Sequence, residues 1–151
     1  MYTFKSFITF ALLVLTIAGS STLAFGKECR DMGGTAVAQA LSENQFAIAT
    51  EGNLNGGGYA KVHTAPEKVD DKHSKMTLSH YFVTSAGSYI YTNDVLMLTQ
   101  LSKDLYFGET TYEVGKSGGE FEGMRGAFTS TGLFDFAAGT VVVKFKGKIC
   151  R

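Results

Sequence analysis

The sequence predicts an all-β protein, a single eight-stranded antiparallel β-barrel with a short N-terminal helical turn, closed by a terminal disulfide. Short segments alternate apolar and polar residues, a period of two that is typical of strands with one buried face. Turn signals separate these segments at short, regular spacing, as in sandwiches and barrels. The composition of 18 glycines, one proline and 13% aromatic residues also favours an all-β globule over a disordered chain.

The chain of 151 residues is expected to hold one folded domain, residues 27–151, after a signal peptide at residues 1–26. Lys5 provides a basic start, residues 7–17 form an apolar run, and small residues near Gly26 suit cleavage. The run is too short to span a bilayer, so no membrane span is expected after cleavage. The alternative is an uncleaved N-terminal anchor. The predicted location is secreted or periplasmic.

The charge balance argues against strongly anionic partners. Removal of residues 1–26 takes away Lys5, which leaves 13 basic side chains against 14 acidic ones and a net charge of −1. Such a chain has no general attraction for nucleic acid or for an anionic membrane. No nucleic-acid partner is therefore predicted.

Two cysteines, Cys29 and Cys150, lie near the two ends of the predicted domain. An even number of cysteines in an exported chain predicts a disulfide. The link would close a loop of about 120 residues and tie the first strand region to the last. Two free thiols or an intermolecular bond are the alternatives.

The first half of the domain contains one expected helical segment and one expected hairpin. Residues 30–42 include Ala36–Leu41, whose alanines favour one or two helical turns. Residues 45–54 and 59–64 alternate as strands around a turn rich in Asn and Gly. Residues 65–75 are charged and contain the only proline, so we expect an exposed loop.

The middle of the chain supplies the most informative strand. Residues 76–84 alternate, and His80 is in phase with Met76, Leu78 and Phe82 on the inner face. Residues 88–92 and 95–101 are then predicted as two strands around Asn93-Asp94.

The last third contains three more strand segments. Residues 110–114 place Tyr112 on one face, and residues 121–132 are expected to continue as a glycine-bent strand. In the final strand one face is apolar and the other carries lysines; the apolar members are Val141, Val143, Phe145 and Ile149, and the lysines are Lys144, Lys146 and Lys148.

A family resemblance attaches to this last third. Its motifs are Thr110-Thr-Tyr-Glu-Val, Gly118-Gly-Glu-Phe-Glu-Gly, Gly139-Thr and the closing Gly147-Lys-Ile-Cys. They resemble the allene oxide cyclase barrel-like superfamily, in particular its small secreted bacterial members; plant allene oxide cyclases and dirigent proteins share that barrel. The resemblance implies the fold, and no active residue is carried over from it.

The candidate ligand-binding residues are His80, Tyr112 and Phe128. Alternation places His80 and Tyr112 on inner faces of an aromatic-rich barrel. An inward histidine is more often a core residue that hydrogen-bonds a neighbouring Thr or Tyr, and the sharper hypothesis is a polar anchor in a ligand cavity. Barrels of eight strands can be filled by side chains or hold one small ligand, so both interpretations stay open.

No catalytic residue, metal site or cofactor is predicted. The chain has no Ser-His-Asp, Cys-His or nucleotide-binding pattern, and Glu120 and Glu122 are expected to face solvent. The spacing of His63 and His73 around Asp70 and Asp71 matches no common zinc pattern.

The sequence thus favours a non-catalytic protein, a secreted small β-barrel whose candidate partner is a small hydrophobic molecule in the barrel. The alternatives are an isomerase or cyclase that acts on a hydrophobic substrate in the cavity, and a structural or interaction module of the cell envelope. The enzyme alternative requires at least two convergent polar groups in the cavity. A homo-oligomer is also compatible with this class of barrel.

Overall fold

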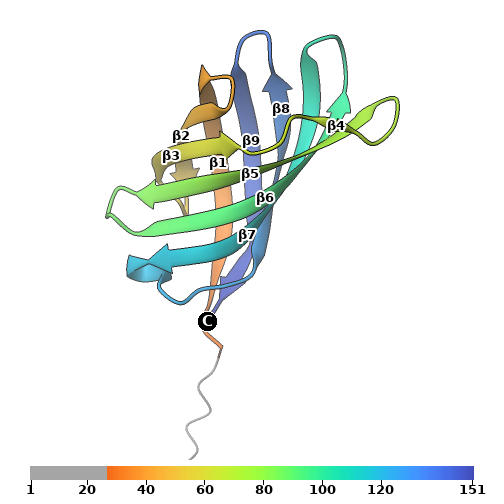
Figure 1. Cartoon of the computed structure of the whole chain (residues 1–151). Helices are drawn as coiled ribbons and strands as arrows, with labels where there is room; N and C mark the ends of the chain where they lie inside the picture. The colour runs from red at the N-terminus through yellow and green to blue at the C-terminus, as the bar shows by residue number, and fades with distance from the viewer. Residues whose placement is uncertain (1–26) are drawn as a thin grey trace, which may run out of the picture.

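The structure, a computed structural model, describes residues 27–151, and the predicted signal peptide lies outside these residues. It is an all-β barrel of long antiparallel strands (Figure 1). The described elements in chain order are β1 (Cys29–Ser42), β2 (Gln45–Gly52), β3 (Gly56–Val62), β4 (Glu67–Lys68), β5 (His73–Thr84), β6 (Tyr89–Gln100), β7 (Leu105–Gly118), a 3₁₀ turn η1 (Gly119–Phe121), β8 (Ala127–Asp135) and β9 (Thr140–Cys150).

The barrel closes because its two outer full-length strands pair with each other. The strand order β3-β2-β1-β9-β8-β7-β6-β5 is joined at its ends by an antiparallel β3–β5 pairing that runs from Gly56↔Thr84 to Val62↔Leu78. The two-residue strand β4 pairs with β5 beyond the end of β3. The prediction of an eight-stranded antiparallel barrel is therefore confirmed, with β4 as an addition.

The helical turn predicted within residues 30–42 is wrong, because this whole segment is strand β1. Ala36 and Ala38 point into the barrel, whereas Val37 on the other face is 51% exposed. β1 pairs with β2 on one side and with β9 on the other over most of its length. These backbone ladders outweigh the helix propensity of alanine, which is only a weak local preference.

Two further boundaries differ from the prediction. The segments 88–92 and 95–101 form one strand, β6, and Asn93-Asp94 lies in its middle instead of in a turn. The strand expected from residue 121 begins only at Ala127, after the 3₁₀ turn and a short loop. Gly119 starts that turn with a φ of +65°, a conformation that side chains rarely adopt.

One end of the barrel is filled and sealed. At this end lie the two chain-terminal strand ends, the β2–β3 and β5–β6 turns and the β7–β8 connection. Five apolar side chains there are at most 2% exposed: Leu54, Ile90, Phe121, Met124 and Ile149. Arg30 covers the Phe121 ring, with its guanidinium 5.8 Å from the ring centroid, and also pairs with Glu120 at 2.6 Å. We call this end the closed end.

The predicted disulfide Cys29–Cys150 is present at the closed end. It joins register partners of β1 and β9 that are 121 residues apart in sequence, so one bond spans the domain from its first strand to its last. The backbone continues the pairing past the bond, since Glu28 and Arg151 exchange two hydrogen bonds.

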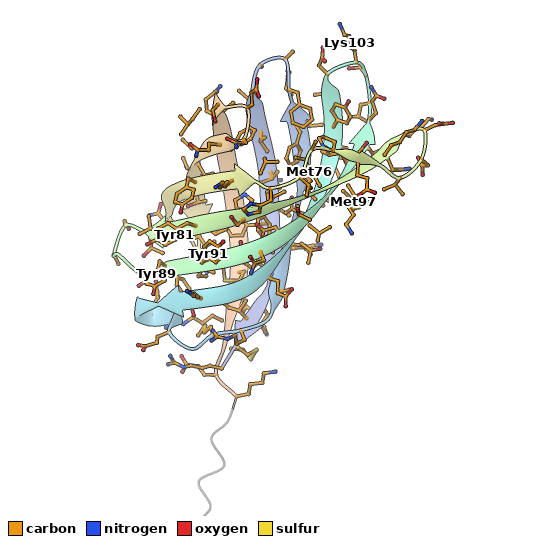
Figure 2. All side chains as sticks on the ribbon, in the orientation of Figure 1. Met76, Tyr81, Tyr89, Tyr91, Met97 and Lys103 are labelled. Carbon is orange, nitrogen blue, oxygen red and sulfur yellow. A yellow bond between two sulfur atoms is a disulfide. The ribbon has the colours of Figure 1, made fainter. Side chains whose placement is uncertain are left out.

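The outer surface follows the predicted alternation. The lysines of β9 are exposed, while Val141, Val143, Phe145 and Ile149 on its other face are buried. Figure 2 shows Tyr81, Tyr89 and Tyr91 together on the outside of β5 and β6, where the rings of Tyr81 and Tyr89 stack with centroids 5.7 Å apart.

Candidate ligand cavity

The end of the barrel opposite the disulfide is hollow. It contains a cavity of about 360 Å³, whose rim residues come from the β1–β2 turn, the β3–β4 connection and the β8–β9 turn. The β1–β2 and β8–β9 turns lie at the top of Figure 1. Its rim includes exposed residues, among them Glu43, Pro66 and Phe136. Its walls are almost entirely apolar; the inner lining consists of Ala36, Ala38, Phe46, Ile48, Ala60, Val62, Met76, Leu78, His80, Phe82, Leu96, Thr110, Tyr112, Phe134, Val141 and Val143. We call this end the open end.

The space exists because small residues occupy inward positions on β1 and β3, the strands on either side of β2. Ala36 and Ala38 of β1 and Ala60 of β3 line the cavity where larger side chains would fill it. Gly108 of β7 has a different role, since a methyl group there would collide with the ring of Phe134. The glycine thus lets Phe134 lie flat against β7 and leaves the centre of the barrel free.

One buried histidine–carboxylate pair lies at the floor of the cavity. Nδ1 of His80 on β5 is 2.7 Å from Oδ2 of Asp94 on β6. The two residues are diagonal neighbours, because His80 pairs with Thr92 in register and Asp94 pairs with Leu78. The Asp94 side chain is completely buried, and that of His80 keeps 10% of its surface exposed where it lines the cavity. A histidine held by a carboxylate in this way has a fixed ring orientation.

The contacts of His80 leave one ring nitrogen for the cavity. Phe82 stacks on the imidazole with ring centroids 5.1 Å apart, and Tyr112 meets it edge-on at 5.0 Å. Nδ1 is engaged by Asp94, and Nε2 has no hydrogen-bond partner among residues 27–151. Nε2 is therefore the polar atom that this pair presents to a bound molecule.

Tyr112 forms a second polar group beside the pair. Its hydroxyl hydrogen-bonds the Ser130 hydroxyl at 2.8 Å. Burial raises the pKa of Tyr112 to about 12, an effect that the nearby Asp94 charge reinforces and the Ser130 hydrogen bond opposes. The phenol therefore stays neutral throughout the physiological range.

Phe128 lies below the cavity instead of lining it. Its ring stacks on Tyr112 with centroids 4.6 Å apart and planes at 13°, and it is 2% exposed. Of the three candidate binding residues, His80 and Tyr112 line the cavity, and Phe128 supports Tyr112 from the closed end. The sequence reasoning correctly placed all three inside the barrel, although it could not place Phe128 beyond the cavity floor.

The floor also holds polar atoms without partners. Oδ1 of Asp94 and Oγ1 of Thr92 are buried and form no hydrogen bond with any part of the chain that the structure describes. A buried polar atom without a partner costs about 1–3 kcal/mol, so proteins rarely keep two of them together for packing alone. Their position beside His80 indicates a polar site and not an ordinary core.

A β-bulge lies next to these atoms. The β6–β7 register shifts between Tyr91 and Thr92, which pair with Lys116 and Val114, so Gly115 has no register partner. Bulges bend a strand and are enriched beside functional sites. Here two register pairs, Thr92–Val114 and Asn93–Glu113, separate the bulge from the register partners Asp94 and Tyr112.

Asp94 is the site residue that sequence reasoning missed. Asn-Asp is a common turn signal, and it divided β6 into two predicted strands. The available signal was the unbroken alternation through this dipeptide, because Ile90, Thr92, Asp94, Leu96 and Leu98 all point inward. The bland interpretation of His80, a hydrogen bond to a Thr or Tyr, is also wrong, since its partner is a carboxylate.

The other histidines do not join the site. His63 Nε2 is 3.0 Å from the Ser79 hydroxyl, and His73, the first residue of β5, contacts Asp70 at 2.8 Å. Within residues 27–151 no three His, Cys, Asp or Glu side chains are grouped so that they could hold a metal ion.

Comparisons with known proteins return no match: no protein-family model, no curated protein and no solved structure matches this chain. The resemblance to the allene oxide cyclase barrel-like superfamily stays a prediction from the motifs.

Among the helical elements of residues 27–151, none has the length and apolar character needed to cross a membrane.

Proposed function

We propose that this protein binds a small hydrophobic molecule in the cavity at the open end of the barrel, without catalysis. The observation that supports the proposal is the cavity itself, which is apolar on nearly all sides and has one buried polar pair at its floor. Small-molecule sites usually combine an apolar enclosure with a few polar groups that fix the ligand's orientation.

The volume sets the size of the ligand. About 360 Å³ is near the lower limit for pockets that hold small molecules. At about 30 Å³ for each water-sized group, it accommodates roughly a dozen non-hydrogen atoms. A longer ligand would extend through the mouth past Phe136, which is 39% exposed there.

The disulfide supports the proposed location outside the cytoplasm, in a periplasm or the medium. A bond between Cys29 and Cys150 persists in oxidising compartments and is uncommon in a reducing cytosol. In that setting the domain would carry or sequester its ligand as a free globule.

The test is to fill the cavity and measure binding. Wild-type protein is expected to bind 1-methylnaphthalene, an apolar fluorophore of suitable size, in a fluorescence titration. Ala36→Leu places a branched side chain in the cavity and should weaken binding at least tenfold. Val37→Leu is the matched control, because the neighbouring side chain of β1 points outward and is 51% exposed.

Native mass spectrometry of the purified protein, followed by solvent extraction, complements the titration. A co-purified small apolar molecule in wild type, absent from Ala36→Leu, would support the proposal. Wild-type protein that binds no 1-methylnaphthalene, or a folded Ala36→Leu variant that binds it as tightly as wild type, would overturn it.

The His80–Asp94 pair favours a second candidate, an isomerase that acts on a hydrophobic substrate. With Nδ1 held by Asp94, Nε2 could accept a proton from one carbon of a bound substrate and return it to another. A β,γ-unsaturated ketone of about ten carbons provides the test, since its conversion to the α,β isomer changes the ultraviolet absorbance. Turnover by wild type that is lost in His80→Gln would support catalysis, whereas equal rates in both would exclude this role for His80.

A further inference from the structure

The polar side chains in the inner lining of the cavity are few and lie together at its floor: His80, Tyr112 and Thr110. The Tyr112 hydroxyl is bound to Ser130, and Nδ1 of His80 is bound to Asp94. Nε2 of His80 remains without a partner among residues 27–151, at the floor of a mostly apolar enclosure. If the cavity holds a ligand, as proposed above, the ligand's polar group must satisfy Nε2.

The charge of the pair restricts that polar group. The Nδ1–Oδ2 hydrogen bond contains one proton; with no proton on Nε2 the pair carries a net charge of −1, and with a proton on Nε2 as well it is neutral. In neither state does it offer net positive charge to a carboxylate. The polar side chains packed nearby on other strands are Thr110, Tyr112 and Ser130. They carry no charge, so they do not change this balance. An anionic head group would therefore lose its hydration without compensation.

A cationic head group is disfavoured for a different reason. An ammonium group carries three N–H donors, each of which needs an acceptor once it is buried. Nε2 offers at most one lone pair, and the hydroxyls of Thr110 and Tyr112 are the other polar side-chain groups in the lining near it, the latter already bound to Ser130. The remaining lining around His80 consists of Leu78, Phe82 and Ala60, which accept nothing.

A hydroxyl group fits Nε2 in every protonation state. When the imidazole is neutral with its proton on Nδ1, Nε2 accepts a hydrogen bond from the hydroxyl. When Nε2 carries a proton, it donates to the hydroxyl oxygen. A hydroxyl also brings no charge into the cavity, so the cost of its burial is offset by a single hydrogen bond.

We infer that the ligand is a neutral apolar molecule with one hydroxyl group, bound hydroxyl-first against Nε2 of His80 with its apolar part along the alanine-lined wall. This inference rests on the proposed function and names the ligand class of the same cavity. It assigns Asp94 a positioning role, since that residue orients the imidazole without contacting the ligand.

Four probes of similar length test the ligand class by displacement of 1-methylnaphthalene: decan-1-ol, undecane, decanoate and decylammonium. Wild-type protein is expected to bind decan-1-ol at least tenfold more tightly than decanoate or decylammonium. Tighter binding of either charged probe than of decan-1-ol would overturn the inference.

The variant His80→Phe/Asp94→Leu replaces both members of the pair by apolar side chains, so no charge is left buried without a partner. Loss of one hydrogen bond should weaken decan-1-ol binding about tenfold. Undecane binding should change less than twofold, because that probe has no polar group. Equal decan-1-ol affinity in the variant and in wild type would contradict the proposed contact.

A second variant keeps the test decisive if the double variant folds poorly. Asp94→Asn retains a hydrogen-bonding group beside Nδ1 and removes the negative charge. It should reduce the preference for decan-1-ol over decanoate by at least threefold, and an unchanged preference would contradict the charge argument.

These outcomes separate the two proposals. If neither 1-methylnaphthalene nor undecane binds wild-type protein, the proposed function fails. If both bind and are excluded by Ala36→Leu, while decan-1-ol shows no dependence on His80, only the ligand class fails.

Discussion

The closed end and the open end of the barrel are built by the same eight strands but filled differently. At the closed end, Phe128, Phe145 and Ile90 occupy the interior, and residues 119–126 fold across the opening to bury Phe121 and Met124. At the open end, the inward positions of β1 and β3 are alanines, and a cavity of about 360 Å³ remains. The difference indicates that the closed end provides most of the stability, which allows the open end to remain hollow.

A polar layer separates the two ends. His80, Asp94, Tyr112 and Ser130 lie between the cavity above and Phe128 below. The aromatic stack of Phe128 on Tyr112 supports this layer from the closed end, so packing there fixes the position of the groups that a ligand would meet.

The largest expected effect comes from the covalent link at the closed end. Cys29→Ser/Cys150→Ser opens a loop of 121 residues and should lower the free energy of unfolding by about 4–5 kcal/mol on the chain-entropy account. Urea unfolding of the variant and of wild type under non-reducing conditions measures the difference. An unchanged midpoint would mean that the backbone pairing of β1 with β9 alone holds this end.

Truncation of one phenylalanine at each end tests the comparison directly. Phe128→Ala should lower the free energy of unfolding by about 3–5 kcal/mol, because it leaves a cavity in a packed region. Phe46→Ala at the open end should cost only about 1 kcal/mol, since that half-buried ring already borders empty space. Chemical denaturation of both variants gives the two values, and equal losses would refute the assignment of stability to the closed end.

The polar layer should make the free energy of unfolding depend on pH in the alkaline range. Tyr112 has a pKa of about 12 in the folded protein, whereas the unfolded chain releases this proton near pH 10. Between these values the unfolded state binds fewer protons, so the free energy of unfolding falls as the pH rises, by about 2–3 kcal/mol between pH 10 and pH 12.

Tyr112→Phe provides the control for this effect. The variant loses the hydrogen bond to Ser130, which should cost about 1 kcal/mol at neutral pH. Its unfolding free energy should then fall less steeply above pH 10 than that of wild type. Urea titrations at several alkaline pH values decide the matter, and parallel curves for the two proteins would show that Tyr112 titrates normally.

The strand segments were predictable where alternation was clean. β9 shows Val141, Val143 and Phe145 facing inward and lysines facing outward, and the phase of His80 in β5 was equally clear. β1 was not predictable in the same way, because alanine at positions 36, 38 and 40 is common to good helices and to strands that must leave space. Only the pairing with β2 and β9, which depends on residues far along the chain, decides between them.

The site was predictable in part. The alternation of each strand identified His80 and Tyr112 as inward-facing residues. The cavity, however, depends on which inward-facing residues of the eight strands lie at the same height along the barrel axis, and the sequence of one strand does not contain that information. Asp94 was missed because a local turn signal was followed in preference to the longer alternation of β6. Residues 119–126 cover the closed end through tertiary packing of Phe121 and Met124, which the local sequence also does not predict.

The pairing of β3 with β5 has one more consequence. Within residues 27–151 it leaves no long unpaired sheet edge, and the part of β5 that β3 does not reach is covered by β4 and by backbone hydrogen bonds from His63 and Val69. Exposed margins are where foreign strands add and fibrils begin. The barrel of residues 27–151 thus combines an apolar cavity with a sheet that offers no free edge to a foreign strand.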